Sequence, residues 1–364
     1  MYCMWDDKCH TNKSTRELFL WYKLTLIIIS KINIIMKKIT SYFVLLFIAT
    51  TLLSGFKSTA QDNLNTSNSE SGLLVQYLEE NGNFINTDAP AIVLADEIRD
   101  NLNNKKYLVI DIRSDSWFAY GHIKHAENVA ASELLNYFET KITPSNFDKI
   151  TIVCYSGQSA AYYASLLRLS GYKNVFSLKW GMSSWDQEFA ENIWVKNSTN
   201  TFADKLQTSP NEMPSNGTLP AINTGKTEAK EILKARVKVA FAKPYSAFIV
   251  KADSVFNNPS DFYIVNYVNE ETYNFGHIEG AVRYEPKGSL SSTTSLYTLP
   301  ADKKILINCN TGQSAAYVVA YLEVLGYDVS NLGYGSNSFM NKMLVEKGWD
   351  GFSPKEINSY PISE

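Results

Sequence analysis

Cysteine and histidine are scarce in this 364-residue chain, which has four of each. The cysteines are Cys3, Cys9, Cys154 and Cys309, too few for a disulfide scaffold and wrongly spaced for a zinc site. The sequence also has no glycine-rich phosphate motif, metal-ligand cluster or nucleotide fingerprint. We therefore expect neither a metal nor an organic cofactor.

The body of the chain has no excess of basic residues. The formal net charge is −3, but residues 1–60 carry eight Lys/Arg and three Asp/Glu, which leaves 26 basic and 34 acidic residues in 61–364. Such an acidic body argues against nucleic acid as a partner. With 45% apolar and 20% charged residues the chain is expected to fold, and its length predicts about two domains.

The N-terminal part is typical of an export signal. Residues 36–60 begin with Met-Lys-Lys, continue through a largely uncharged apolar stretch and end on Ser-Thr-Ala. This order predicts a secretory signal peptide cleaved after Ala60, with Met36 as the true start. Residues 1–60 would be an N-terminal extension plus signal peptide, and the mature protein would be exported, to the periplasm. The alternative is an uncleaved helix that anchors the protein to the membrane.

An internal repeat sets the domain organisation. The segment KITIVCYSGQSAAYYASLLRLSGY around Cys154 resembles KKILINCNTGQSAAYVVAYLEVLGY around Cys309, 155 residues later. Gly-His-Ile turns at 121 and 276 have the same spacing. The repeat predicts two copies of one domain. The predicted boundaries are domain 1 at 73–195, a polar linker at 196–228, a lead-in helix at 229–241 and domain 2 at 242–352.

Each copy alternates strand and helix patterns. In the first copy, apolar runs at 106–112, 149–154 and 174–178 are of strand length, and helical spacing follows at 159–169 and 180–190. Strands that are apolar throughout are expected to be buried on both faces. The predicted fold class is α/β, with each domain a mostly parallel sheet flanked by helices on both faces.

Both cysteines end a predicted strand and precede a predicted helix by a short loop. The first loop continues through Tyr155, Ser156, Gly157, Gln158 and Ser159, and the second through Asn310, Thr311, Gly312, Gln313 and Ser314. The glycines allow a tight bend in which backbone N–H groups converge on the sulfur, and the two serines are plausible helix N-caps. Such a loop predicts a lowered thiol pKa and a stabilised anion at the sulfur.

The combined motifs resemble the rhodanese family in a tandem arrangement. The resemblance rests on an Asp-x-Arg strand end at Asp111 and Arg113, the Gly-His-Ile turns with His122 and His277, and the cysteine loops. It implies a sulfurtransferase in which sulfane sulfur passes from a small donor to a thiophilic acceptor, a thiol or a protein. The donor would be of the thiosulfate or 3-mercaptopyruvate type.

Site roles follow from the same resemblance. Cys154 and Cys309 would be persulfide-carrying catalytic residues, and the five residues after each cysteine would form the anion-binding loop. The Asp-x-Arg pair and the two histidines would form the site scaffold rather than take part in the chemistry.

Two departures leave alternatives open. The second copy has Asn266 and Val268 in place of the Asp-x-Arg pair, so domain 2 could be a weaker catalyst, a binding module or a sulfur relay. Neither loop contains Arg or Lys, which argues against a phosphatase and leaves the donor undecided. A non-catalytic module that binds a partner or senses sulfur species is the alternative function. A Cys154–Cys309 disulfide is a further possibility, because its geometry cannot be judged from sequence.

Overall fold

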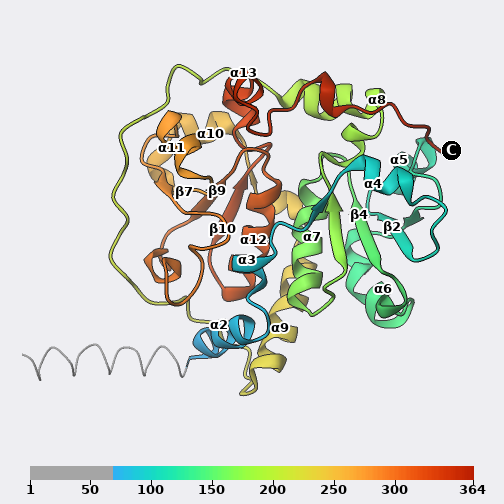
Figure 1. Ribbon diagram of the computed structural model, residues 1–364. Helices are drawn as coiled ribbons and strands as arrows, with labels where there is room; N and C mark the ends of the chain where they lie inside the picture. Colours follow the sequence, from blue (N-terminus) through green and yellow to red (C-terminus); the bar gives the residue numbers. More distant parts are fainter. Residues whose placement is uncertain (1–68) are drawn as a thin grey trace, which may run out of the picture. The chain divides into compact units, whose positions relative to one another are not determined.

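The computed structural model describes residues 69–364 (Figure 1). The predicted extension and signal peptide at 1–60 lie outside this range. Within 69–364, no helix combines the length and the apolar character that crossing a bilayer requires.

Two five-stranded parallel sheets form the framework and confirm the predicted α/β class. In the first sheet the order is β1-β5-β4-β2-β3, with strands β1 (Ile92–Val93), β2 (Tyr107–Asp111), β3 (Glu127–Asn128), β4 (Lys149–Val153) and β5 (Val175–Leu178). The second sheet repeats this as β6-β10-β9-β7-β8, with strands β6 (Ile249–Val250), β7 (Tyr263–Asn266), β8 (Val282–Arg283), β9 (Ile305–Asn308) and β10 (Val329–Leu332).

The central strands are apolar on both faces because helices cover both sides of each sheet. In β4, for example, Ile150, Ile152 and Val153 are fully buried. The α-helices are α2 (Glu70–Glu80), α3 (Phe84–Thr87), α4 (Ala95–Asp100), α5 (Asp115–Tyr120), α6 (Leu134–Thr140), α7 (Gln158–Leu169), α8 (Gln187–Ala190), α9 (Ala229–Ala242), α10 (Ala252–Asn257), α11 (Glu270–Phe275), α12 (Gln313–Leu325) and α13 (Asn337–Lys347).

Short helical turns complete the elements. One is a π-helical turn, η4 (Glu191–Val195), and the others are 3₁₀ turns: η1 (Ala131–Glu133), η2 (Pro144–Asn146), η3 (Gly181–Ser184), η5 (Tyr245–Phe248), η6 (Pro259–Asp261), η7 (Leu296–Thr298) and η8 (Pro354–Glu356).

Helices α7 and α12, the equivalent helices of the two copies, pack against each other between the two sheets (Figure 1). Both have a Ser-Ala-Ala segment in the first turn, and these alanines are fully buried. Small side chains let the two helices approach closely. Hydrogen bonds cross the contact from Ser165 Oγ to the Tyr317 carbonyl, 3.0 Å, and between Ser177 Oγ and the Tyr317 hydroxyl, 3.1 Å. The helices that follow the two cysteines therefore form the core of the contact between the copies.

Each copy is also covered by the chain segment that follows the other copy. The C-terminal segment crosses to the first sheet, where His122 and Ser363 exchange backbone N–H···O bonds of 2.9 Å (Figure 1). The segment after domain 1 does the same for domain 2, since Gln207 and His277 exchange backbone bonds of 2.8 and 2.9 Å. Both Gly-His-Ile turns are thus fixed by reciprocal strand-like contacts.

The helix predicted at 180–190 is not continuous, and that prediction was wrong. The segment forms the 3₁₀ turn η3 and then the short α8, because Asp186 between them is extended (φ −143°, ψ 151°). The Asp186 carboxylate caps α8 by accepting a hydrogen bond from the Glu188 amide, 3.0 Å. Side-chain capping by Asp interrupts the helix here although the apolar spacing favours a continuous one.

Candidate active site

The sulfur of Cys154 lies where β4 ends and α7 begins. Cys154 is 1% exposed, and its Sγ accepts hydrogen bonds from the backbone amides of Gly157, 3.1 Å, and Ala160, 3.3 Å. Gly157 adopts φ 84°, a left-handed conformation that brings its amide round to face the sulfur. Amides converge on this sulfur as predicted, but only Gly157 belongs to the predicted five-residue loop, and Ala160 lies one residue beyond it.

Cys309 has the same environment at the end of β9. It is 3% exposed, and its Sγ accepts from the amides of Gly312 and Ala315, both at 3.2 Å. Gly312 has φ 73°. The two cysteines are free thiols, not a disulfide. The cysteine loop therefore has the same geometry in both copies, even though two of its side chains differ between them.

The expected N-caps were assigned to the wrong residues. Helices α7 and α12 begin at Gln158 and Gln313, one residue before the serines, and their N-caps are Gly157 and Gly312. The left-handed glycines turn the chain into the helix, so no side-chain cap is made. Ser159 instead lies inside the first turn and hydrogen-bonds the Cys154 sulfur.

The remaining loop residues contact the walls of the site. The Tyr155 ring packs edge-on against Trp117, and its hydroxyl lies 3.3 Å from the amide and the hydroxyl of Ser114. The Ser156 carbonyl accepts from Trp194 Nε1, 3.1 Å, and its hydroxyl accepts from Gln158 Nε2, 3.1 Å.

In the second loop the same positions are fixed differently. The Asn310 carbonyl accepts from the amide and the side-chain Nδ2 of Asn337, at 3.2 and 2.8 Å. Thr311 Oγ1 accepts from the Gln313 amide, 3.1 Å. Ser314 lies half-buried in the first turn of α12. The backbone of each loop is therefore held from outside the loop by a different set of polar side chains.

A glycine on the neighbouring strand end closes each loop from behind. A Cβ on Gly181 would lie 2.4 Å from the Cys154 carbonyl oxygen, and one on Gly335 would lie 2.1 Å from that of Cys309. The next residue in each case, Met182 or Ser336, donates its amide to that cysteine carbonyl at 2.9 Å. Only glycine permits this close approach. Sequence reasoning missed both glycines, although the repeat aligns them.

Asp111 and Arg113 form a buried ion pair beside the Cys154 loop. Arg113 Nη2 lies 2.7 Å from Asp111 Oδ2, and Arg113 Nε donates to both carboxylate oxygens at 3.0 and 3.1 Å. Arg113 Nη2 also donates to the Gly121 carbonyl, 2.6 Å, which ties β2 to the Gly-His-Ile turn. The guanidinium lies over the Tyr155 ring, 5.9 Å from its centroid. The pair thus connects the strand, the turn and the loop.

Neutral amides replace this ion pair in domain 2. Asn266 Oδ1 accepts from Asn308 Nδ2 across neighbouring strands, 2.8 Å, and Asn308 also donates to Ser336 Oγ, 3.1 Å. Val268 is buried where Arg113 stands in domain 1. Asn308 was not foreseen, because its counterpart in domain 1 is the apolar Val153. An amide network therefore holds the second strand end together without charge.

Both histidine rings hydrogen-bond a carbonyl of the helix that precedes them. Nδ1 of His122 lies 2.9 Å from the Phe118 carbonyl, and Nδ1 of His277 lies 2.8 Å from that of Tyr273. The His122 ring stacks on Phe118 and the His277 ring stacks on Tyr273, in each case with the ring centroids 3.8 Å apart. Burial lowers the pKa of His277, which favours its neutral form. Neither imidazole hydrogen-bonds a cysteine sulfur, so we interpret both as structural.

Burial raises the pKa of both cysteine thiols, contrary to the expectation of a lowered value. Hydrogen bonds to the sulfur from the loop amides, and from Ser159 at Cys154, lower these pKa values but do not compensate. Amide dipoles supply only partial charge, while removing a thiolate from water costs more. The resting thiols are therefore protonated at neutral pH.

A pH titration checks this shift. Alkylation of Cys154 and Cys309 by iodoacetamide should rise with pH and reach half its maximum above the ordinary thiol pKa of about 8.5, since only the thiolate reacts. The rate would be followed by mass spectrometry of the native protein over a pH series. The same protein in urea provides the control, and its midpoint should fall at the ordinary value. A native midpoint below the urea midpoint would contradict the dominance of burial.

The two cysteine loops are linked to each other by an exchange of glutamine side chains. Gln313 Oε1 accepts from the Trp180 amide of domain 1, 2.8 Å, while Gln158 Oε1 accepts from the Tyr334 amide of domain 2, 2.8 Å. Gln313 Nε2 also donates to the Gly157 carbonyl, 3.3 Å. Each loop thus contributes a side chain that holds the other copy.

The two residues that donate their amides in this exchange are strained in the same way. Trp180 and Tyr334 both have φ 63°, in the left-handed region that aromatic residues rarely adopt. Each immediately precedes the glycine that closes its cysteine loop. The aligned repeat was the only sequence signal for these positions, and it could not show that the glutamines cross between copies.

Comparison with known proteins agrees with this geometry. The rhodanese-like domain model matches residues 94–188 and 256–342, and each match contains one cysteine loop. The chain belongs to the rhodanese-like domain family. The tandem resemblance predicted from the sequence is therefore confirmed.

Relatives of this family are named as sulfurtransferases. The thiosulfate sulfurtransferase GlpE of Haemophilus influenzae is 38% identical over 79 residues, which cover 21% of this chain and 71% of the relative. GlpE of Pseudoalteromonas translucida is 29% identical over 93 residues, 25% of this chain and 85% of the relative. This similarity supports rhodanese-type sulfurtransferase activity in general.

Two solved structures match over more of the chain. SseA from Escherichia coli, described as a 3-mercaptopyruvate sulfotransferase, is 19% identical and covers 66% of this chain and 97% of its own, with a TM-score of 0.24. Thiosulfate sulfurtransferase from Pseudomonas aeruginosa is 14% identical and covers 82% of this chain and 70% of its own, also with a TM-score of 0.24. With TM-scores this low, these likenesses are not evidence for a shared substrate.

Proposed function

We propose that the protein is an exported sulfurtransferase that carries sulfane sulfur as a persulfide on Cys154. The observation that carries this proposal is the buried Cys154 sulfur at a strand end, held by the Gly157 and Ala160 amides at 3.1 and 3.3 Å. Convergent amide donors at the end of a parallel strand are suited to an anion.

The chemistry has two steps. The Cys154 thiolate attacks the outer sulfur of the donor, a new S–S bond forms, and the donor's own bond to that sulfur breaks. With thiosulfate the leaving group is sulfite, which takes the electron pair. A nucleophilic acceptor such as cyanide or a thiolate then attacks the terminal sulfur, and the Cys154 thiolate leaves. No external oxidant or reductant is needed.

The raised thiol pKa gives the loop amides a specific task. Because the resting thiol is neutral, its proton must leave before the sulfur can attack. Once the persulfide has formed, its negative charge is on the terminal sulfur, and amide donors around the loop can stabilise that charge. We therefore assign the loop to stabilisation of the loaded state rather than of the resting thiolate.

Domain 1 is the better candidate for the main site. Its loop is backed by the Asp111–Arg113 ion pair, whereas domain 2 has only the neutral Asn266–Asn308 contact at that place. Cys309 nevertheless retains the same two amide donors. We propose Cys154 as the principal sulfur carrier and Cys309 as a second, weaker one.

The donor, the acceptor and the location extend the proposal. A small donor of the thiosulfate or 3-mercaptopyruvate type and a thiol or protein acceptor are proposed from the family, and the loops, which contain no Arg or Lys, do not choose between the two donors. The proposed export to the periplasm rests on the signal-like pattern of residues 36–60. N-terminal sequencing of the secreted protein would test cleavage after Ala60.

Sulfur loading tests the activity directly. Incubation of the purified protein with thiosulfate, or with 3-mercaptopyruvate, should add the mass of one sulfur atom to the peptide containing Cys154. Cyanide should remove that sulfur and release thiocyanate. Intact and peptide mass spectra before and after cyanide measure both steps. If neither donor adds sulfur to either cysteine, the non-catalytic binding or sensing module is the better assignment.

A further inference from the structure

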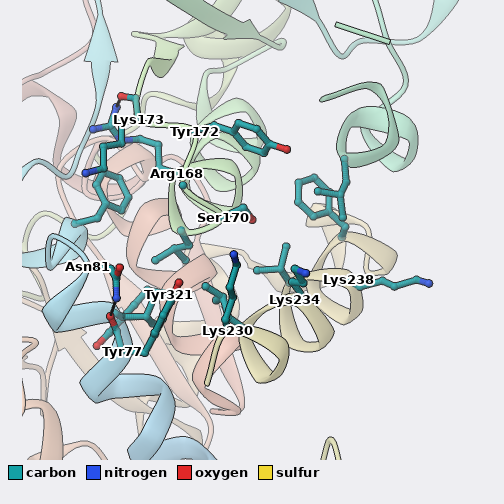
Figure 2. A pocket seen from close by; sticks show the side chains of 18 of the residues that line it. Tyr77, Asn81, Arg168, Ser170, Tyr172, Lys173, Lys230, Lys234, Lys238 and Tyr321 are labelled. Carbon is teal, nitrogen blue, oxygen red and sulfur yellow. Dashed lines mark hydrogen bonds between the residues drawn. The ribbon is translucent and has the colours of Figure 1, made fainter. Parts of the chain in front are cut away.

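A large cavity lies at the end of α7 opposite to the cysteine loop. It has a volume of about 810 Å³ and is lined by residues of α2, α6, α7 and α9 (Figure 2). Cys154 precedes the first turn of α7, whereas the cavity is lined by the last turn and the residues that follow, from Arg168 to Lys173. Since a twelve-residue helix is about 18 Å long, the cavity is separate from the candidate active site.

Part of the cavity lining is apolar. The apolar residues that line it and are themselves mostly buried in the core are Leu78, Ile85, Leu169, Leu233, Val237 and Phe241. Pockets of about 300–1,000 Å³ with an apolar lining and a few polar groups are the common form of small-molecule sites. The wall therefore suits an alkyl or acyl chain.

The polar groups around this wall are predominantly cationic. Five basic residues line the cavity, namely Arg168, Lys173, Lys230, Lys234 and Lys238, against the two acidic residues Asp88 and Glu139. The local charge of +3 contrasts with the excess of acidic residues in 61–364 as a whole. Concentrated positive charge in an otherwise acidic body attracts anions to this place.

Several of these cations have no ionic partner. Within the described residues, Lys173, Lys230 and Lys238 form no ion pair, and Lys234 pairs only with the exposed Glu231, 2.9 Å. In Figure 2 the Lys230 side chain points from α9 toward the end of α7 that carries Ser170, whereas Lys238 points away from the other labelled residues. Lys230 and Lys234 lie one helical turn apart on α9 and both line the cavity, so they can bind the same anionic group once Lys234 exchanges its exposed partner Glu231 for that group.

Arg168 is a buried cation of the cavity lining. It is 9% exposed, pairs with Asp88 at 3.5 Å and donates to the Val175 carbonyl, 3.1 Å. Its Nε has no hydrogen-bond partner. Its guanidinium also lies over the Phe84 ring, 4.7 Å from the centroid. Arg168 thus adds a buried positive charge next to the apolar wall.

We propose that this cavity binds a long-chain carboxylate, with the acyl chain along the apolar wall and the carboxylate at Lys230 and Lys234. The combination of an apolar lining with the unpaired ammonium group of Lys230 and the exposed, Glu231-paired ammonium group of Lys234 matches an amphipathic anion better than a neutral lipid or a small polar anion. The site is independent of the cysteine chemistry proposed above.

Titration with the fluorescent fatty acid cis-parinarate tests the proposal on the full chain. We expect saturable binding at one site, displaced by palmitate. Lys230→Glu/Lys234→Glu should weaken it by about tenfold or more, since two attractive charges become repulsive. Both lysines are exposed, so the variant should fold, which its melting curve would verify. Leu135→Trp, which places a large ring at the cavity wall, should weaken binding without a change of charge.

Matched controls separate the site from general effects. Lys303→Glu/Lys355→Glu makes the same charge change at exposed residues outside the cavity and should leave binding unchanged. Cys154→Ser/Cys309→Ser should also bind normally, so loss of sulfur transfer and loss of this site are distinguishable. Absence of saturable binding, equal weakening in both lysine double variants, or equal displacement by hexadecanol would overturn the proposal.

Discussion

Cys154→Ser is expected to lower cyanide-dependent thiocyanate production on the order of 10³-fold or more, because it removes the proposed nucleophile. Serine keeps the small polar side chain that accepts the Gly157 and Ala160 amides at 3.1 and 3.3 Å, so the loop should retain its shape. Its hydroxyl is a poor nucleophile toward sulfur and ionises far less readily than a thiol. The rate would be measured with thiosulfate and with 3-mercaptopyruvate as donors.

The second cysteine provides the matched control for this experiment. Cys309 has the same burial and the same two amide contacts, so Cys309→Ser makes the same chemical change in the other copy. It should retain most of the activity, because domain 2 lacks the Asp-Arg ion pair. Unchanged activity in the double variant would contradict the proposed function. Loss of activity in Cys309→Ser alone would move the principal site to domain 2.

Arg113→Val is expected to lower the free energy of unfolding by about 3–5 kcal/mol, because it leaves the buried Asp111 carboxylate without its cation. The Arg113 and Asp111 side chains are 0% and 1% exposed. The variant also removes the donor to the Gly121 carbonyl, 2.6 Å, and opens a void beside the Phe189 ring. Urea unfolding followed by tryptophan fluorescence would measure the change.

Domain 2 supplies the residues for a matched control variant. Domain 2 has Asn266 and Val268 at these two positions, so Asp111→Asn/Arg113→Val gives domain 1 the second copy's residues. The double variant removes the buried charge along with its partner and should be less destabilised than Arg113→Val alone. Equal losses in the two variants would show that the void, rather than the unpaired charge, dominates the effect.

Local sequence pattern was enough for most of the framework. Apolar runs predicted the central strands, and the 155-residue spacing paired the two cysteine loops. The structure has parallel sheets at these places, with amides directed at both sulfurs. Such features depend on neighbours in the chain, so their signals are local: strand period, a glycine that permits a bend, and a helix that starts at a fixed distance.

Two predictions failed because an interaction that the local sequence pattern does not show outweighed the pattern. The apolar spacing at 180–190 favours one helix, yet the Asp186 side chain caps a new one. The loop amides favour a thiolate, yet burial of Cys154 raises its pKa. In the second case the decisive quantity is solvent exposure, which is set by the packing of the whole domain.

The sequence by itself determined that the chain is a tandem α/β repeat with one cysteine loop in each copy, because periodicity and spacing depend only on the order of the residues. Only the tertiary structure decided how the copies depend on each other. The side chains of Gln158 and Gln313 each accept a hydrogen bond from a backbone amide of the other copy. The segments at Gln207 and Ser363 each pair with the Gly-His-Ile turn of the other copy. These contacts join residues more than 60 positions apart, so a local pattern in the sequence does not contain them.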